Sequence, residues 1–121
     1  MSANSILVVD DDLAILDMIA ELLGYEGYKV LTSNSGNDAL IQAKDHAPGL
    51  ILLDLMMPEM SGWQVISALR SAPQTRAIPV VLLSARRDLA ATAQDLGVEH
   101  FLEKPFDLDE LLGLVGKYML Q

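Results

Sequence analysis

The stretch ILVVDDD, residues 6–12, decides the fold, because an unbroken apolar run stops there at three consecutive carboxylates. The stretch LILLD, residues 50–54, repeats the pattern and stops at Asp54. VVLLS, residues 80–84, is a third apolar run and stops at Ser84. Continuously apolar runs of this length are typical of parallel strands that are buried on both faces. We therefore predict three central strands, each with a polar residue at its carboxyl end.

Two further runs carry polar residues and are predicted to be edge strands. Residues 28–32 include Lys29, and residues 99–102 include Glu99 and His100. Natural sheets often protect their edges with charged side chains. A segment with helical periodicity follows each of the five runs. We expect these helices over residues 13–23, 37–47, 63–71, 89–96 and 108–119.

The alternation of strands and helices predicts a parallel sheet with right-handed crossovers and helices on both faces. Apolar strands belong inside and polar ones at the edges, which gives the doubly wound strand order 2-1-3-4-5. The predicted fold class is therefore α/β, a flavodoxin-like five-stranded parallel sheet with five helices. We expect Asp12 to cap the first helix and Gly24 to end it, and Asp88 and Gly97 to bound the fourth.

The ends of the predicted strands gather chemically active side chains. In an open parallel sheet, ligands bind at the carboxyl ends of the strands, near the switch in strand order. Asp10 and Asp11 follow the first strand and Asp54 the third, so the three carboxylates should converge. Two carboxylates about 5 Å apart repel by roughly 3 kcal/mol at an effective dielectric near 20. Oxygen-only ligands favour Mg²⁺ as the cation that relieves this repulsion.

A carboxylate beside a bound Mg²⁺ can act as a nucleophile toward phosphorus. Phosphoryl transfer requires mainly positioning and positive charge at the non-bridging oxygens. Lys104 after the fifth strand offers a second cation, and the Ser84 hydroxyl offers a hydrogen bond. Asp54 lies between them in the predicted sheet and is the natural attacking group.

These residues resemble the receiver domain of two-component response regulators (CheY-like), and the match covers essentially the whole chain. The matching fragments are ILVVDDD (6–12), LLDLMMP (52–58), Gly62, LLSA (82–85) and EKPF (103–106). Each fragment is weak alone, but their order and spacing form a specific signature.

The resemblance implies a role for each residue of the site. Asp54 would accept the phosphoryl group. Asp11 would bind Mg²⁺ directly and Asp10 directly or through water, with Asp54 and the backbone carbonyl of Met56 completing the protein ligands. Lys104 would pair with the phosphoryl group.

The resemblance also implies a conformational switch. Ser84 and Phe101 would be its residues, and the surface formed by the fourth helix, fifth strand and fifth helix would change. Met56 and Arg86 would tune the lifetime of the phosphoryl group. The peptide bond between Lys104 and Pro105 is expected to be cis.

The implied function is a phosphorylation-dependent signalling switch. The phosphoryl donor would be a sensor histidine kinase or a histidine phosphotransfer protein, and the output a downstream protein target or effector domain. The domain would catalyse only its own phosphorylation and dephosphorylation, with no turnover of an external substrate. Two alternatives stay open: a Mg²⁺-dependent phosphohydrolase with an aspartyl-phosphate intermediate, and a receiver-like interaction module that is not phosphorylated.

Composition narrows the class of protein. The chain has 121 residues, the size of one domain, and we expect residues 1–121 to form a single receiver domain. Its formal net charge of −9 disfavours direct contact with nucleic acid. It contains no cysteine, which excludes disulfides and thiol catalysis. No apolar stretch approaches the roughly 18 residues of a membrane span. We expect a cytoplasmic protein.

Overall fold

The computed structural model describes residues 5–85 and 89–119, and its elements alternate between strand and helix. The strands are β1 (Ser5–Val9), β2 (Lys29–Ser33), β3 (Leu50–Asp54), β4 (Val80–Ser84) and β5 (His100–Glu103). The helices are α1 (Leu13–Tyr25), α2 (Gly36–His46), α3 (Gly62–Ser71), α4 (Leu89–Asp95) and α5 (Leu108–Met119). Every predicted element is present, with ends within one or two residues of those expected.

The five strands form one parallel sheet in the order β2-β1-β3-β4-β5, which confirms the predicted topology. The register aligns the carboxyl ends of the central strands. Val9 pairs with Leu53, and Asp54 pairs with Leu83 on the next strand. The residues that follow β1, β3 and β4 therefore lie along one edge of the sheet.

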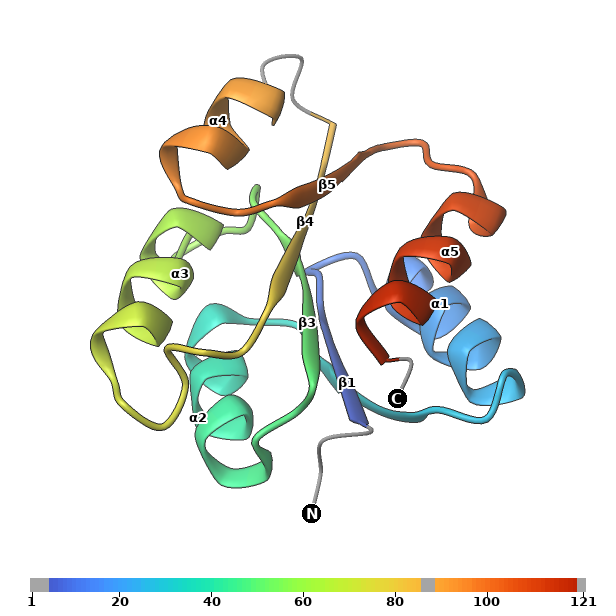
Figure 1. Cartoon of the computed structure of the whole chain (residues 1–121), viewed down its shortest axis with the longest axis horizontal. Coiled ribbons are helices and arrows are strands. Elements are labelled where there is room, and N and C mark those ends of the chain that lie inside the picture. Colours follow the sequence, from blue (N-terminus) through green and yellow to red (C-terminus); the bar gives the residue numbers. More distant parts are fainter. Residues whose placement is uncertain (1–4, 86–88, 120–121) are drawn as a thin grey trace.

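Helices cover both faces of the sheet (Figure 1), with α1 and α5 on one side and α2, α3 and α4 on the other. Alternate residues of β1 serve the two layers: Leu7 and Val9 pack toward α2 and α3, and Ile6 and Val8 toward α1 and α5. Every residue of β1, β3 and β4 is buried, whereas β2 and β5 contain exposed positions. The division into central and edge strands is therefore also confirmed.

The first helix differs from the prediction at its carboxyl end. It passes through Gly24 and ends at Tyr25, so the expected stop at Gly24 is wrong. The chain turns instead at Gly27, whose φ of 96° is a left-handed conformation that glycine adopts at low cost. The core face of α1 is also narrower than the sequence suggests, because Leu16, Ile19 and Leu23 are buried while Leu13 is 60% exposed.

The helix starts follow local hydrogen-bonding rules. Asp12 caps α1 as predicted, and its side chain accepts hydrogen bonds from the backbone N–H groups of Ala14 and Ile15. Ser61 and Gln64 form a reciprocal capping box at the start of α3. The expected cap at Asp88 lies outside the described residues. Within the described part of the chain, no helix is both long and apolar enough to cross a membrane.

Candidate functional site

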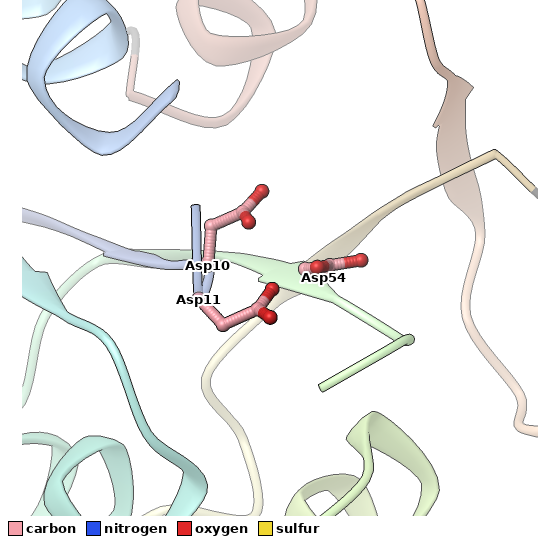
Figure 2. Close-up of side chains that lie close together, drawn as sticks. All are labelled: Asp10, Asp11 and Asp54. Atoms are coloured by element: carbon pink, nitrogen blue, oxygen red, sulfur yellow. The ribbon is translucent and has the colours of Figure 1, made fainter. Parts of the chain in front are cut away.

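Three carboxylates converge at the carboxyl edge of the sheet, as the strand order predicted. Asp10 and Asp11 follow β1 and Asp54 ends β3, and Figure 2 shows them side by side. One carboxylate oxygen of each residue lies within 4.8 Å of the other two. Asp10 and Asp54 are buried, and Asp11 is exposed to solvent. The site is thus a largely enclosed acidic cluster with one side open to water.

Lys104 brings a positive charge to this cluster from the loop between β5 and α5. Its Nζ lies 2.6 Å from Oδ2 of Asp10 and 3.6 Å from Oδ2 of Asp54. The backbone N–H of Lys104 donates to the carbonyl oxygen of Ser84 at 2.8 Å, which ties the loop to the end of β4. The backbone of Lys104 is therefore held by Ser84, and its ammonium group is held by the two buried carboxylates.

The backbone fixes the two buried carboxylates in the same way. Oδ1 of Asp10 accepts a hydrogen bond from the N–H of Asp12 at 2.9 Å. Oδ1 of Asp54 accepts one from the N–H of Met56 at 3.1 Å. In each residue the second oxygen faces Lys104. The orientation of both carboxylates is thus set before any ligand binds.

Burial raises the pKa of Asp54 from 3.8 to about 6. The hydrogen bond from Met56 opposes this rise, the charge of Asp10 adds to it, and the charge of Lys104 opposes it. Desolvation disfavours the charged form of a carboxyl group, so the direction is that expected for an enclosed acid. The folded structure therefore holds the charged form of Asp54 at a higher free energy than an exposed aspartate would have.

Ser84 and Phe101 lie where the sequence pattern placed them. Ser84 is fully buried at the end of β4, the strand next to β3. Phe101 lies on edge strand β5 and is 38% exposed. The peptide bond between Lys104 and Pro105 is cis, as the resemblance implied. Arg86, expected to tune the lifetime of the phosphoryl group, lies outside the described residues.

Comparison with known proteins identifies the family. The profile of the response regulator receiver domain matches residues 6–116. The chain belongs to this family. KdpE, a transcriptional regulatory protein of Mycobacterium tuberculosis, is 39% identical over 109 residues, which cover 88% of this chain and 47% of KdpE. RpaA of Synechocystis, a DNA-binding master transcriptional regulator, is 38% identical over 91% of this chain and 46% of RpaA. The chain thus spans about half the length of the curated relatives it matches.

Solved structures agree with this assignment. The Vibrio cholerae chemotaxis protein CheY4 superposes with a TM-score of 0.86 at 28% identity, covering 94% of this chain and 97% of CheY4. The receiver domain of Francisella response regulator 1452 superposes with a TM-score of 0.86 at 29% identity, covering 96% of each chain. The predicted CheY-like fold and family are confirmed.

The donor set of this receiver domain fits a hard divalent cation. It consists of carboxylate oxygens alone, from Asp10, Asp11 and Asp54, with the exposed Asp11 on the side from which an ion and its waters would enter. Ions such as Mg²⁺ prefer such ligands and usually keep several waters. The backbone carbonyl of Met56, the fourth ligand implied by the resemblance, stays a prediction.

The close approach of α3 to the end of β3 explains Gly62. A Cβ atom at this position would lie 2.7 Å from Cα of Leu55, too close for any side chain. The N–H of Gly62 also donates to the carbonyl oxygen of Leu55 at 3.0 Å. The loop after Asp54 is thereby closed, with Met57 buried and Met56 54% exposed beside the acidic cluster.

An apolar cavity of about 490 Å³ adjoins the acidic cluster and was not predicted from the sequence. Its lining residues come from α1, from the loops after β4 and β5, and from the start of α5: Ile15, Met18, Ala85, Lys104, Pro105, Phe106 and Leu108. Lys104 belongs to both sites. Ile15 is partly buried and contributes both to this cavity and to the core layer beneath α1 and α5.

Proposed function

We propose that the chain is a phosphorylation-dependent switch in which Asp54 accepts a phosphoryl group. The observation that carries the proposal is the position of Asp54. It is buried at the end of a central strand, grouped with Asp10 and Asp11, and lies 3.6 Å from the ammonium group of Lys104. Such a cluster does not stabilise a hydrophobic core, whereas phosphoryl transfer requires a fixed nucleophile surrounded by positive charge.

In the proposed reaction, a carboxylate oxygen of Asp54 attacks the phosphorus atom of a phosphohistidine. The new P–O bond forms as the P–N bond breaks, and the imidazole leaves with the electron pair. Bound Mg²⁺ would supply charge neutralisation at the non-bridging oxygens. Lys104 would supply a second positive charge there, and the hydroxyl of Ser84 a hydrogen bond. The N–H of Met56, which donates to Oδ1 of Asp54 at 3.1 Å, would orient the attacking carboxylate.

The same charge change would drive the switch. An aspartyl phosphate adds anionic oxygens next to β4, which gives the hydroxyl of Ser84 a new partner. Movement of Ser84 would make room behind β4 for Phe101, whose ring is now 38% exposed on β5. We expect the surface formed by α4, β5 and α5 to change as a result and to control the downstream partner.

The donor is proposed to be a sensor histidine kinase or a histidine phosphotransfer protein. The apolar cavity supports a protein donor, because it shares Lys104 with the acidic cluster and gives a docking protein apolar contacts beside Asp54. Exposed Met18 and Leu108 at its rim extend this surface. Apolar contacts of this kind would orient the phosphohistidine for transfer.

The downstream output of the switch is proposed from the names of the relatives. KdpE and RpaA are named as transcriptional regulators, and this chain matches about half of each. We therefore propose that phosphorylation here controls transcription through another domain or protein. The net charge of −9 predicts electrostatic repulsion between residues 1–121 and DNA.

Intact mass after incubation with acetyl phosphate and Mg²⁺ tests the proposal. We expect one phosphoryl increment on the parent chain and on an Asp45→Asn control, which changes an exposed carboxylate of α2. The increment should be lost in Asp54→Asn and after chelation of Mg²⁺. An increment that persists in Asp54→Asn would contradict the assignment of the acceptor.

Two further results would favour the alternatives. No increment, even with a phosphorylated donor protein, would favour the unphosphorylated interaction module. Steady-state turnover of a phosphate ester in many-fold excess over the protein would favour the phosphohydrolase.

A further inference from the structure

Lys104 contacts Asp10 more closely than it contacts the proposed phosphoryl acceptor. The distance from Nζ to Oδ2 of Asp10 is 2.6 Å, within hydrogen-bond range, whereas Oδ2 of Asp54 lies 3.6 Å away. A hydrogen bond between an ammonium group and a carboxylate, such as the contact with Asp10, is roughly twice as strong as one between neutral groups. The ammonium group is therefore bound primarily to a residue of the cation site.

Both oxygens of Asp10 are engaged in this arrangement. Oδ1 accepts from the N–H of Asp12 at 2.9 Å, and Oδ2 accepts from Lys104. The side chain of Asp10 is 0% exposed, so water cannot replace either partner. A buried carboxylate without a partner is strongly destabilising, which gives this ion pair a role in the chain without any ligand.

We propose that Lys104 is the internal counter-cation of the acidic cluster and thereby sets its affinity for divalent cations. This role is additional to pairing with the phosphoryl group, and it rests on the proposed function because it concerns the same cation site. An ion that enters the cluster meets a carboxylate already neutralised by an ammonium group. Lys104 consequently weakens cation binding and, in the absence of the cation, stabilises the fold.

The test is calorimetric titration with Mg²⁺ alone at about pH 8, on the parent chain and on Lys104→Met. Methionine keeps most of the length of the side chain and removes its charge. We expect the Kd for Mg²⁺ to fall by about tenfold or more, because removal of a positive charge a few ångströms away strengthens the attraction of the cluster for the ion. Lys29→Met is the matched control, because it removes the same charge at the start of β2, at the opposite edge of the sheet.

The pairing with Asp10 is tested in a second background. If Lys104 acts through Asp10, the gain from Lys104→Met should shrink markedly when Asp10→Asn is already present. Melting temperature without Mg²⁺ provides an independent measurement: Lys104→Met should melt below the parent and should gain more from Mg²⁺ than the parent does. Should Lys104→Met fail to fold without the ion, folding induced by Mg²⁺ would itself support the proposal, and Lys104→Gln would supply the titration.

Equal or weaker Mg²⁺ binding in Lys104→Met, with the parent binding Mg²⁺ normally, would overturn this inference and leave the proposed function standing. An equal gain in Lys29→Met would also overturn it, because the effect would then reflect net charge. Absence of Mg²⁺ binding in the parent and in every Lys104 variant would overturn both.

Discussion

Within β1, β3 and β4 the apolar side chains are enclosed between two helical layers, while at the ends of the same strands the enclosed side chains are polar. Leu52 and Leu53 gain free energy from burial, whereas burial of Asp54, one residue further, raises its pKa and disfavours its charged form. The apolar strand bodies and the polar strand ends belong to the same strands and are buried to a similar degree. Burial of the apolar side chains stabilises the fold, whereas burial of the carboxylates destabilises it. The strand bodies therefore offset the cost of holding a reactive cluster in a fixed place.

The largest effect is expected in the strand bodies. Leu52→Ala removes a fully buried side chain and should lower the free energy of unfolding by about 3–5 kcal/mol, from lost burial and the cavity left behind. Urea denaturation followed by circular dichroism measures it. A loss below about 1 kcal/mol would show that the core repacks freely around the smaller side chain and that the strand bodies are not tightly packed.

The second largest effect on stability is expected from Mg²⁺ binding at the carboxyl ends of the central strands. Mg²⁺ at a hundredfold excess over its Kd should stabilise the parent by about 2.7 kcal/mol, because the ion binds only the folded cluster. Asp11→Asn should lose most of this gain with little change in metal-free stability, since Asp11 is exposed. Asp17→Asn, an exposed position on α1, is the control. Equal stabilisation of all three proteins by Mg²⁺ would contradict binding at this cluster.

Substitution of a buried residue usually lowers the stability of the fold, but Asp54→Asn should raise it. At about pH 8 we expect a gain of roughly 1–2 kcal/mol, since one pKa unit corresponds to about 1.4 kcal/mol. The pKa of Asp54 is raised from 3.8 to about 6, so the folded parent binds a proton more readily than the unfolded chain. The parent therefore loses stability relative to Asp54→Asn as the pH rises from 3.8 to about 6.

The gain from Asp54→Asn should accordingly be full above pH 6 and decline as pH falls toward 3.8. Thermal unfolding over this pH range provides the measurement. A gain that does not depend on pH, or a variant less stable than the parent at about pH 8, would show that Asp54 is not destabilised by burial.

The smallest effect is expected on the outer face of α5, away from both regions. Gly113 is exposed within the helix, and a Cβ atom there would meet nothing within 4 Å. Gly113→Ala should therefore raise stability by about 1 kcal/mol through helix propensity alone. Gly62→Ala is the opposing control and should destabilise, because its Cβ would lie 2.7 Å from Cα of Leu55. Denaturation midpoints of the two variants should move in opposite directions.

Local rules explain what was predictable from the sequence. The apolar runs of β1, β3 and β4 determined which strands are central, and the polar residues after them located the cluster. The end of α1 was missed because the left-handed turn that glycine permits is made at Gly27, while the helix continues through Gly24 to Tyr25. The exposed fraction of Leu13 and the cavity beside α1 depend on how helices and loops pack, which periodicity alone does not encode.

The partner of Lys104 was likewise beyond local rules. Its pairing with the phosphoryl group was implied by resemblance, but its contact with Asp10 depends on the final positions of two loops. The strand order brings both loops to one edge of the sheet without fixing which carboxylate lies nearer. Only the assembled structure distinguishes 2.6 Å from 3.6 Å.

The ion pair between Asp10 and Lys104 has a consequence for how the chain is made. Its members lie 94 residues apart, so the pair closes only after the last strand has joined the sheet. A chain still emerging from the ribosome would carry Asp10 and Asp54 without the cation that accompanies them. The acidic cluster therefore acquires its internal counter-charge only when β5 and the loop after it have folded onto the sheet.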